Sequence, residues 1–201
     1  MKNYILLALI SVFTFSSCKK DDPIQEVDQE ELSAASLTFT PVEKEVIDGK
    51  TIYTAIAGEE IQSIKFEGPN YLPDVGKHLD LHVGETYKME LKTTDFAGRS
   101  SEHAFVNRAE NHQAFLLGAE NDLLDFEYGE VNNVGVTAYI TIKKISDKIN
   151  FIYVMRHLNN DVKSKITASD WNNNNYLNLF SGANDLELKF QAHLVEEDHT
   201  H

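Results

Sequence analysis

The sequence predicts an all-β domain, an antiparallel β-sandwich of immunoglobulin-like type with one short helix inserted between strands. Beyond about residue 35 the chain consists of short runs in which apolar and polar residues alternate, which is the period of a half-buried strand. Turn residues separate these runs at near-regular intervals. Helical periodicity is confined to one segment, so two packed sheets are the expected architecture.

The expected strands follow one another along the whole domain. The clearest is 86–93, in which Tyr87, Met89 and Leu91 alternate with polar residues after a Gly84-Glu85 turn. In chain order the strands are expected at 37–40, 51–56, 61–66, 78–83, 86–93, 123–128, 135–143, 150–157 and 185–195.

One stretch, residues 99–113, breaks this pattern. Ser101 is a suitable N-cap, and Phe105, Val106 and Ala109 form a narrow apolar stripe. We therefore expect a helix of about three turns between two strands. Trp171, the only tryptophan, lies beside an Asn-rich loop and is expected to close one end of the core rather than to serve as a ligand platform.

The first 17 residues predict a lipoprotein signal peptide. Residues 1–3 carry one positive charge, and an apolar run of about a dozen residues follows, too short to span a bilayer. Residues 15–18, Phe-Ser-Ser-Cys, resemble the lipobox of bacterial lipoproteins. That resemblance implies cleavage before Cys18 and attachment of diacylglycerol to its thiol, and acyl chains of this kind anchor a protein to a membrane.

Composition divides the remainder of the chain into three parts. Residues 18–34 are expected to be the lipidated cysteine and an acidic flexible tether, because they contain few large apolar residues. The sandwich is expected at 35–195 and an acidic, His-containing tail at 196–201. Residues 19–22, Lys-Lys-Asp-Asp, resemble the signal that directs Bacteroidota-type lipoproteins to the exterior face of the outer membrane. The alternative is a solvated linker and a periplasm-facing protein.

Several short segments together resemble a family of small Bacteroidota lipoproteins of unassigned biochemistry. Besides the acidic tether, they are 37–40, 81–91, Glu-Asn-His-Gln-Ala-Phe at 110–115, Arg-His-Leu at 156–158 and the strand at 182–190. The resemblance implies a β-sandwich lipoprotein. It also implies a TonB-dependent outer-membrane receptor as a partner, since genes of this family often lie near such receptors, and so an association with nutrient or metal uptake.

Charge and cysteine content exclude some classes of function. The formal net charge is −14, which disfavours nucleic acid as a partner because phosphates would be repelled. Cys18 is the only cysteine, so the domain cannot contain an intramolecular disulfide.

Histidine is the main candidate chemistry, because neutral imidazole binds zinc and copper and carboxylates complete such sites. His103, Glu110 and His112 lie along or at the end of the expected helix and could form half of a metal site. A strand residue such as His157 would supply the other half. The alternative is a helix cap and a solvated helix face.

Two other histidine pairs lead to different expectations. His199 and His201 end an acidic tail that would capture Zn²⁺, Ni²⁺ or Cu²⁺ loosely, unless it is only a frayed, solvated end. His78 and His82 share one face of a strand but lie roughly 13 Å apart, so they are not expected to chelate one ion together. No cofactor is certain from the sequence, and zinc or copper is the candidate ion.

The chain contains none of the common catalytic motifs: no Gly-x-Ser-x-Gly, no His-Glu-x-x-His, no phosphate-binding loop and no dinucleotide fingerprint. We therefore expect a binding module rather than an enzyme. The first expectation is a lipoprotein accessory to nutrient or transition-metal uptake beside a TonB-dependent receptor. The alternative is a structural, adhesive or complex-scaffolding lipoprotein with no metal role.

Overall fold

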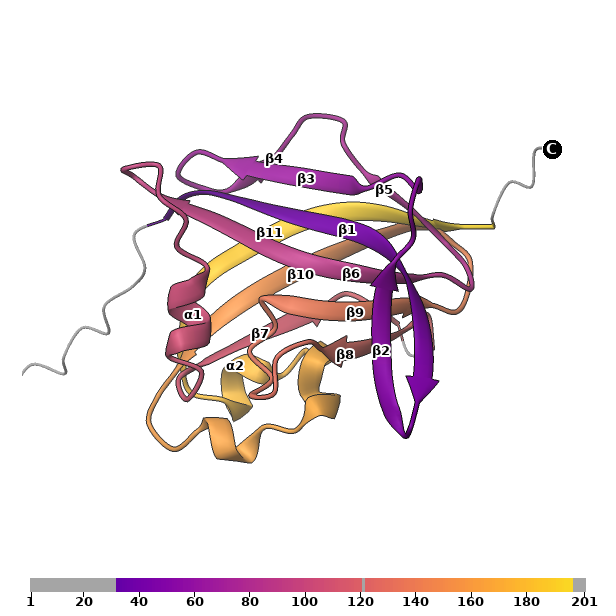
Figure 1. Cartoon of the computed structure of the whole chain (residues 1–201). Coiled ribbons are helices and arrows are strands. Elements are labelled where there is room, and N and C mark those ends of the chain that lie inside the picture. The colour runs from indigo at the N-terminus through magenta and orange to yellow at the C-terminus, as the bar shows by residue number, and fades with distance from the viewer. Residues whose placement is uncertain (1–31, 121, 197–201) are drawn as a thin grey trace, which may run out of the picture.

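In the computed structural model, which describes residues 32–120 and 122–196, two β-sheets pack face to face (Figure 1). The larger sheet has the order β4 (Leu72–Pro73), β3 (Gln62–Glu67), β1 (Leu32–Ile47), β6 (Thr86–Asp95), β9 (Thr137–Ile142) and β8 (Leu124–Tyr128), and β2 (Lys50–Ala55) pairs with the second half of β1. The smaller sheet has the order β5 (Leu79–His82), β11 (Gly182–Val195), β10 (Ser146–Leu158) and β7 (His112–Leu117).

The predicted all-β sandwich with a short helix inserted between strands is confirmed. The strands pair in antiparallel fashion except at one edge of the smaller sheet, where β5 runs parallel to β11. This parallel pair departs from the purely antiparallel expectation. It arises because the chain leaves the larger sheet after β4, contributes the short strand β5 to the other sheet, and returns as β6.

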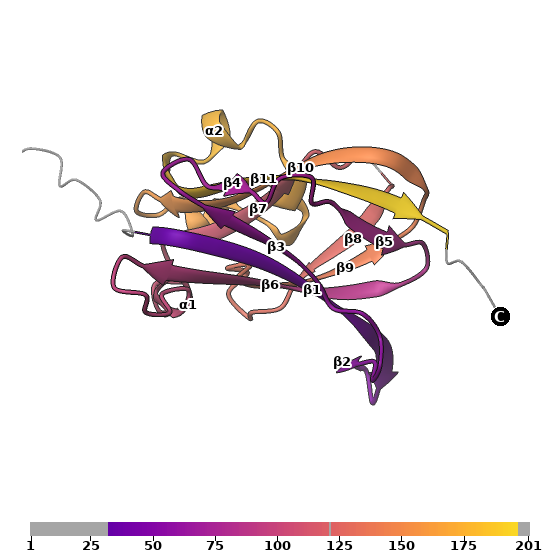
Figure 2. The same cartoon turned by 90° about the horizontal axis from the view of Figure 1, so that it is seen from above.

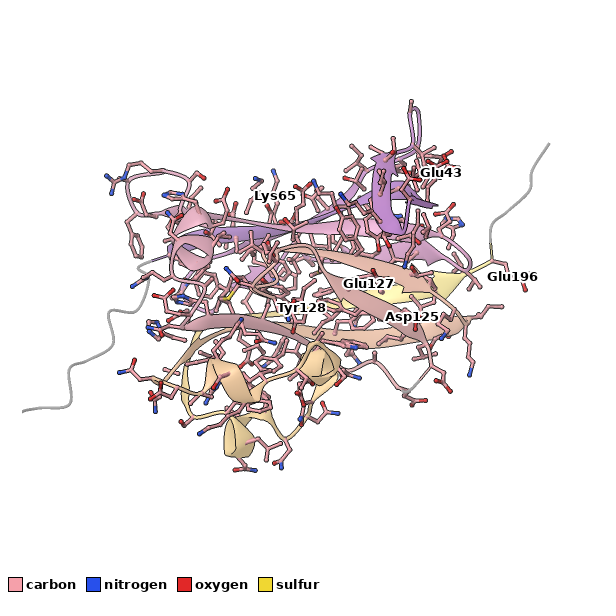
Figure 3. All side chains as sticks on the ribbon, turned by 60° about the horizontal axis from the view of Figure 1, so that its bottom comes forward. Glu43, Lys65, Asp125, Glu127, Tyr128 and Glu196 are labelled. Atoms are coloured by element: carbon pink, nitrogen blue, oxygen red, sulfur yellow. The ribbon has the colours of Figure 1, made fainter. Side chains whose placement is uncertain are left out.

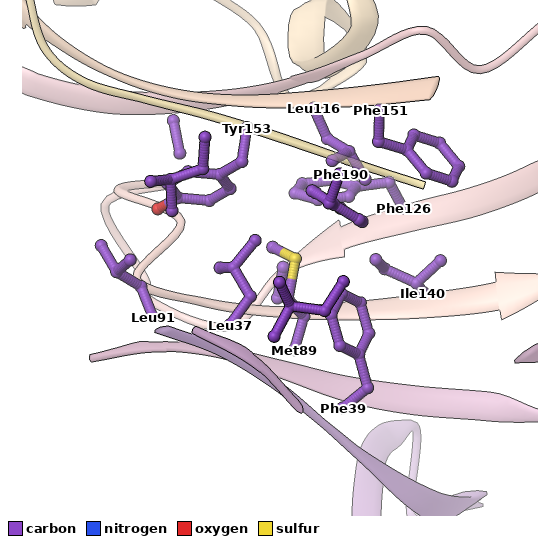
Figure 4. Packing of buried hydrophobic residues seen from close by; sticks show 14 of the residues in the cluster. Leu37, Phe39, Met89, Leu91, Leu116, Phe126, Ile140, Phe151, Tyr153 and Phe190 are labelled. Carbon is purple, nitrogen blue, oxygen red and sulfur yellow. The ribbon is translucent and has the colours of Figure 1, made fainter. Parts of the chain in front are cut away.

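The main core lies between the two sheets and is built by the alternating residues of both. Leu37, Met89 and Leu91 from the larger sheet face Tyr153 and Phe190 from the smaller one (Figure 4). Each is at most 5% exposed, and burial of a large apolar side chain contributes about 1.5–3 kcal/mol. The packing of the two alternating faces therefore supplies the main stabilisation of the fold.

A second, smaller core covers the outer face of the smaller sheet. Residues 163–179, which lie between two expected strands and include the Asn-rich loop, contain three short helices: η1 (Lys163–Lys165), η2 (Ala168–Asn172) and α2 (Tyr176–Leu179). Tyr176 and Phe180 pack there on Phe115 of β7. Trp171 packs against the main core and stacks on Phe126, with ring centroids 5.1 Å apart.

The expected helix of three turns is wrong in length, because α1 spans only His103–Asn107. Ser101 does not cap it. Its backbone N–H donates to the Thr93 carbonyl, and its hydroxyl lies 2.8 Å from the Thr93 hydroxyl. The residues expected to begin the helix therefore pair with the end of β6. At its other end α1 stops at Asn107, and β7 begins at His112, so the helix is short.

The hairpin formed by the second half of β1 and by β2 projects from the sandwich (Figures 1 and 2). Tyr53 stacks on Tyr139 of β9 with ring centroids 3.5 Å apart, and its hydroxyl donates to Glu127 at 2.6 Å. Lys44 forms an ion pair with the same carboxylate. In Figure 3, Glu43 marks this hairpin and Glu127 lies on β8. These contacts fix the base of the hairpin on the larger sheet.

The described domain begins slightly earlier than composition indicates. β1 starts at Leu32, which is buried, so residues 32–34 belong to the sheet rather than to the expected tether. β11 ends at Val195, where the expected domain ends. The expected signal peptide, Cys18, His199 and His201 lie outside the described residues. Within the described residues, none of the helices has both the length and the apolar character needed to cross a bilayer.

Candidate metal centre

Three strands of the smaller sheet bring two histidines and one aspartate together at the end of the sandwich beside α1. β7 pairs with β10 so that His112 lies directly opposite His157. Both follow the alternation of the core residues Ala114 and Tyr153 on their strands, so they face the interior. The imidazole rings are 4.5 Å apart between centroids.

A β-bulge supplies the third side chain. On β11, Asn184 pairs with Arg156 and Leu186 pairs with Met155, which leaves Asp185 as the extra residue between them. Strict alternation would place Asp185 on the face opposite Leu186. The bulge re-aims the side chain, as bulges characteristically do, and the carboxylate meets both histidines.

The ligand atoms of this buried cluster (His112, His157 and Asp185) converge on one carboxylate oxygen. The Oδ2 atom of Asp185 lies 3.1 Å from Nε2 of His112 and 3.7 Å from Nδ1 of His157. All three ligand atoms lie within 4.8 Å of one another. The side chains of His112 and Asp185 are 0% exposed and that of His157 is 8% exposed, so the cluster is almost completely shielded from solvent.

The proton on His112 is assigned by its other hydrogen bond. Nδ1 of His112 lies 2.9 Å from the Arg108 carbonyl, which can only accept, so Nδ1 donates. In a neutral ring this leaves Nε2 as an acceptor that faces the carboxylate of Asp185, a second acceptor, at 3.1 Å. Such a contact is stable only with a proton or a cation between the two atoms.

Two further polar atoms of the buried cluster lack hydrogen-bond partners within the described part of the chain. Nδ1 of His157 and Oδ1 of Asp185 are both enclosed, and neither has a hydrogen-bond partner among the described residues. Burial, reinforced by the neighbouring His112, lowers the pKa of His157, which favours the neutral ring that ligates metals. An enclosed polar group without a partner is costly, so the arrangement favours an additional ligand that joins these atoms.

The surroundings hold the cluster in place. Phe105 of α1 contacts the His112 ring edge-on at 5.2 Å. On the backbone side, Lys163 donates a hydrogen bond of 2.6 Å to the His112 carbonyl, and burial lowers the pKa of Lys163 to about 8. Gly182 lies opposite Leu158, and a Cβ at this glycine would lie only 2.0 Å from the His157 carbonyl oxygen. The absence of a side chain there allows β11 to approach β10 closely just before the bulge.

The donor set and distances fit a tetrahedral transition-metal site. Zinc accepts imidazole nitrogen and carboxylate oxygen at about 2.0–2.2 Å, so neighbouring ligand atoms in a tetrahedron lie roughly 3.3–3.5 Å apart. The observed distances of 3.1 and 3.7 Å bracket this range. Arg108 also fixes the tautomer of His112 through its carbonyl, the arrangement usual for a metal-binding histidine.

The sequence-derived candidates divide between this cluster and other positions. His112 and His157 are brought together, as the hypothesis of a half site completed by a strand required. His103 and Glu110 are exposed and belong to neither of the two groups of metal-ligating side chains found among the described residues. Asp185 was missed, because a bulge that turns its side chain inward leaves no periodic signal in the sequence.

The second such group, the exposed cluster, consists of His78, Asp80 and His193 at the edge formed by β5 and β11. The sequence places His78 on one strand face with His82, four residues along the same strand. The actual neighbour is His193, more than a hundred residues later, which the parallel pairing of β5 and β11 places beside Asp80.

Comparisons with known proteins do not place the chain in a family: no family model, curated protein or solved structure matches it. The protein is thus defined by its own fold and clusters, as an all-β sandwich that holds a buried group of two histidines and one aspartate.

Proposed function

We propose that the protein is a transition-metal-binding module in which His112, His157 and Asp185 bind Zn²⁺ or Cu²⁺. One observation carries the proposal: three enclosed ligand atoms converge on a common point. Because Nδ1 of His112 donates to the Arg108 carbonyl, Nε2 of a neutral His112 is an acceptor, and it faces a second acceptor, Oδ2 of Asp185. A divalent cation bonded to Nε2 of His112, Nδ1 of His157 and Oδ2 of Asp185 removes that conflict and supplies the partner that Nδ1 of His157 lacks.

The main competing explanation is a structural ion pair between a protonated His112 and Asp185. Such a pair would satisfy the 3.1 Å contact but would leave Nδ1 of His157 without a partner. Buried ion pairs also contribute little net stability, because desolvation offsets the Coulombic gain. A metal site accounts for all three side chains with one ligand.

The cellular role that we propose is accessory to nutrient or transition-metal uptake, on a lipoprotein anchored through Cys18 at the outer membrane and facing the exterior. The lipobox-like residues 15–18 and the Lys-Lys-Asp-Asp segment at 19–22 support the anchor and the address. The acidic net charge of −14 would concentrate cations near the domain. A TonB-dependent receptor is the proposed partner.

The direct test is calorimetric titration of Zn²⁺ and Cu²⁺ into a soluble form of residues 19–196. This form contains every described strand and omits residues 197–201, so that the tail histidines do not contribute. We expect binding tighter than about 10 µM, equivalent to more than roughly 7 kcal/mol. His157→Gln should weaken the binding at the buried cluster at least tenfold.

His103→Gln is the matched control, because it removes an exposed histidine on the neighbouring helix that belongs to neither cluster. The variant should bind metal as the unaltered protein does. Absence of binding tighter than about 10 µM, or equal loss in the two variants, would contradict the proposal.

A second candidate function is complex scaffolding without metal, and the projecting hairpin favours it. Val46, Ile47 and Ile52 on this hairpin are 69%, 49% and 42% exposed, and the pairing register places Ile47 and Ile52 on one face and Val46 on the other. Affinity capture of a receptor in the presence of a chelator, lost with Val46→Lys and Ile47→Lys, would support this role.

A further inference from the structure

The exposed cluster lies on the outer face of the smaller sheet, at its edge. Leu79 and Leu81 of β5 point into the core, so the alternating residue Asp80 points outward, as does His78 immediately before the strand. On β11, Ala192 and Leu194 point inward and His193 outward. The parallel register pairs His193 with Asp80, and the three side chains meet on one face.

Both rings approach the same carboxylate oxygen. Oδ1 of Asp80 lies 3.6 Å from Nε2 of His78 and 3.4 Å from Nδ1 of His193. The rings stack with centroids 4.5 Å apart and an angle of 27° between their planes. All three ligand atoms lie within 4.8 Å of one another, and the two contact distances are close to the roughly 3.3–3.5 Å spacing of ligands around a tetrahedral ion.

We propose that His78, Asp80 and His193 form a second transition-metal site that is open to solvent and exchanges its ion readily. The side chains are 44%, 52% and 32% exposed, in contrast to the enclosed ligands of the buried cluster. Three protein ligands leave the fourth position of a tetrahedral ion to water or to a donor atom of another molecule, the arrangement of an open site.

The surrounding surface gives access to that position. His78 borders two hollows, one of 480 Å³ that also contains Asp80 and one of 540 Å³ lined on its apolar side by Phe151 and Phe190. A small chelating molecule in either hollow would therefore lie beside His78 of the proposed site. Two imidazoles and one carboxylate favour Cu²⁺ over Zn²⁺ in affinity.

The two sites are separate. Asp185 and His193 lie eight residues apart on β11, which corresponds to roughly 26 Å along an extended strand. One site faces the core and the other faces solvent, so no side chain is shared. The exposed site deepens the proposed metal-binding function but does not depend on the buried cluster.

The test compares four versions of residues 19–196 by Zn²⁺ titration: the unaltered chain, His193→Gln, His112→Gln and the control His103→Gln. We expect about two ions per chain for the unaltered and control proteins and about one for each of the other two. The ion that remains in His112→Gln should be removed by a chelator at least tenfold faster than the ion that remains in His193→Gln.

The outcomes separate the two proposals. If His193→Gln still binds two ions, the exposed site is refuted. If His112→Gln still binds two ions, the buried site is refuted and the exposed one stands. Since His193 is partly exposed and lies on the outer face, its replacement is expected to leave the far-ultraviolet circular dichroism unchanged. Electron paramagnetic resonance of Cu²⁺ bound to His112→Gln provides an independent measurement and should show two nitrogen ligands. If the double variant His112→Gln/His193→Gln still shows two nitrogen ligands, the exposed site is also refuted.

Discussion

Replacement of Asp185 by asparagine distinguishes a metal site from a structural ion pair at the buried cluster. The metal proposal requires a neutral His112 in the metal-free protein, and because Nδ1 donates to the Arg108 carbonyl, Nε2 is then an acceptor. The new amide can donate to this acceptor, so Asp185→Asn supplies the hydrogen bond that a neutral His112 lacks. We expect the free energy of unfolding to change by less than about 1 kcal/mol.

The ion-pair explanation predicts a much larger effect. Removal of one partner from a buried ion pair typically costs about 3–5 kcal/mol, because the other charge remains enclosed without compensation. The side chains of both Asp185 and His112 are 0% exposed, so the full penalty would apply. Urea unfolding in the presence of a chelator measures the difference directly.

Metal addition should then reverse the order of the two proteins. A ligand at one hundred times its dissociation constant stabilises the folded state by about 2.7 kcal/mol. For a domain of this size that corresponds to a rise in Tm of roughly 5–11 °C. Asp185→Asn removes the only anionic ligand of the buried cluster and should abolish most of this rise.

The thermal scans are made with His193→Gln in both proteins, so that the exposed cluster adds nothing. Asp125→Asn is the matched control, because Asp125 is 61% exposed and forms only a surface ion pair with Lys143. A loss of 3 kcal/mol or more in the metal-free Asp185→Asn protein, together with an unchanged response to Zn²⁺, would refute the reasoning.

Three further predictions concern stability. Burial raises the pKa of Tyr153 well above 10, so the contribution of its protonated form to the free energy of unfolding is complete below pH 10 and falls at higher pH by about 1.4 kcal/mol per pH unit. Tyr153→Phe should therefore reduce the slope of the free energy of unfolding in urea against pH above 10 by that amount. An unchanged slope would contradict the assignment. Gly49→Ala, where a Cβ meets nothing within 4 Å, should cost about 1–2 kcal/mol for its positive φ alone. Gly118→Ala should cost at least 1 kcal/mol more, because its Cβ would lie 2.3 Å from the Asn150 carbonyl oxygen, and equal urea midpoints for the two variants would refute this. Arg156→Met leaves three acceptors without their donor and should lower the free energy of unfolding in urea by about 3 kcal/mol or more. Arg156→Lys should lower it by a smaller amount. No change in Arg156→Met would show that water replaces the guanidinium.

The fold class was accessible from the sequence because alternation is a local signal. Tyr87, Met89 and Leu91 point to one side of any extended strand, whatever its neighbours, so a strand with one buried face could be recognised in isolation. The short helices between 163 and 179 were not recognised. They are only three to five residues long, and the apolar residues Tyr176 and Phe180 acquire their role only when packed on Phe115.

The histidines show the same difference between local sequence signals and contacts that form only in the folded chain. The sequence indicated metal chemistry from residue type and associated His112 with a strand histidine such as His157, but it grouped them with His103 and Glu110, which are exposed. Strand pairing decided the actual partners, and no local pattern encodes pairing between strands far apart in the chain.

By itself the sequence determined the alternating strands, the acidic charge and the supply of imidazole ligands, because each of these belongs to single residues or to near neighbours. Only the tertiary structure decided which ligands meet. The bulge at Asp185 turns one carboxylate into the core, and the parallel pairing of β5 with β11 sets His193 beside Asp80. Both depend on register, which is fixed by the packing of whole sheets rather than by the residues of any one strand.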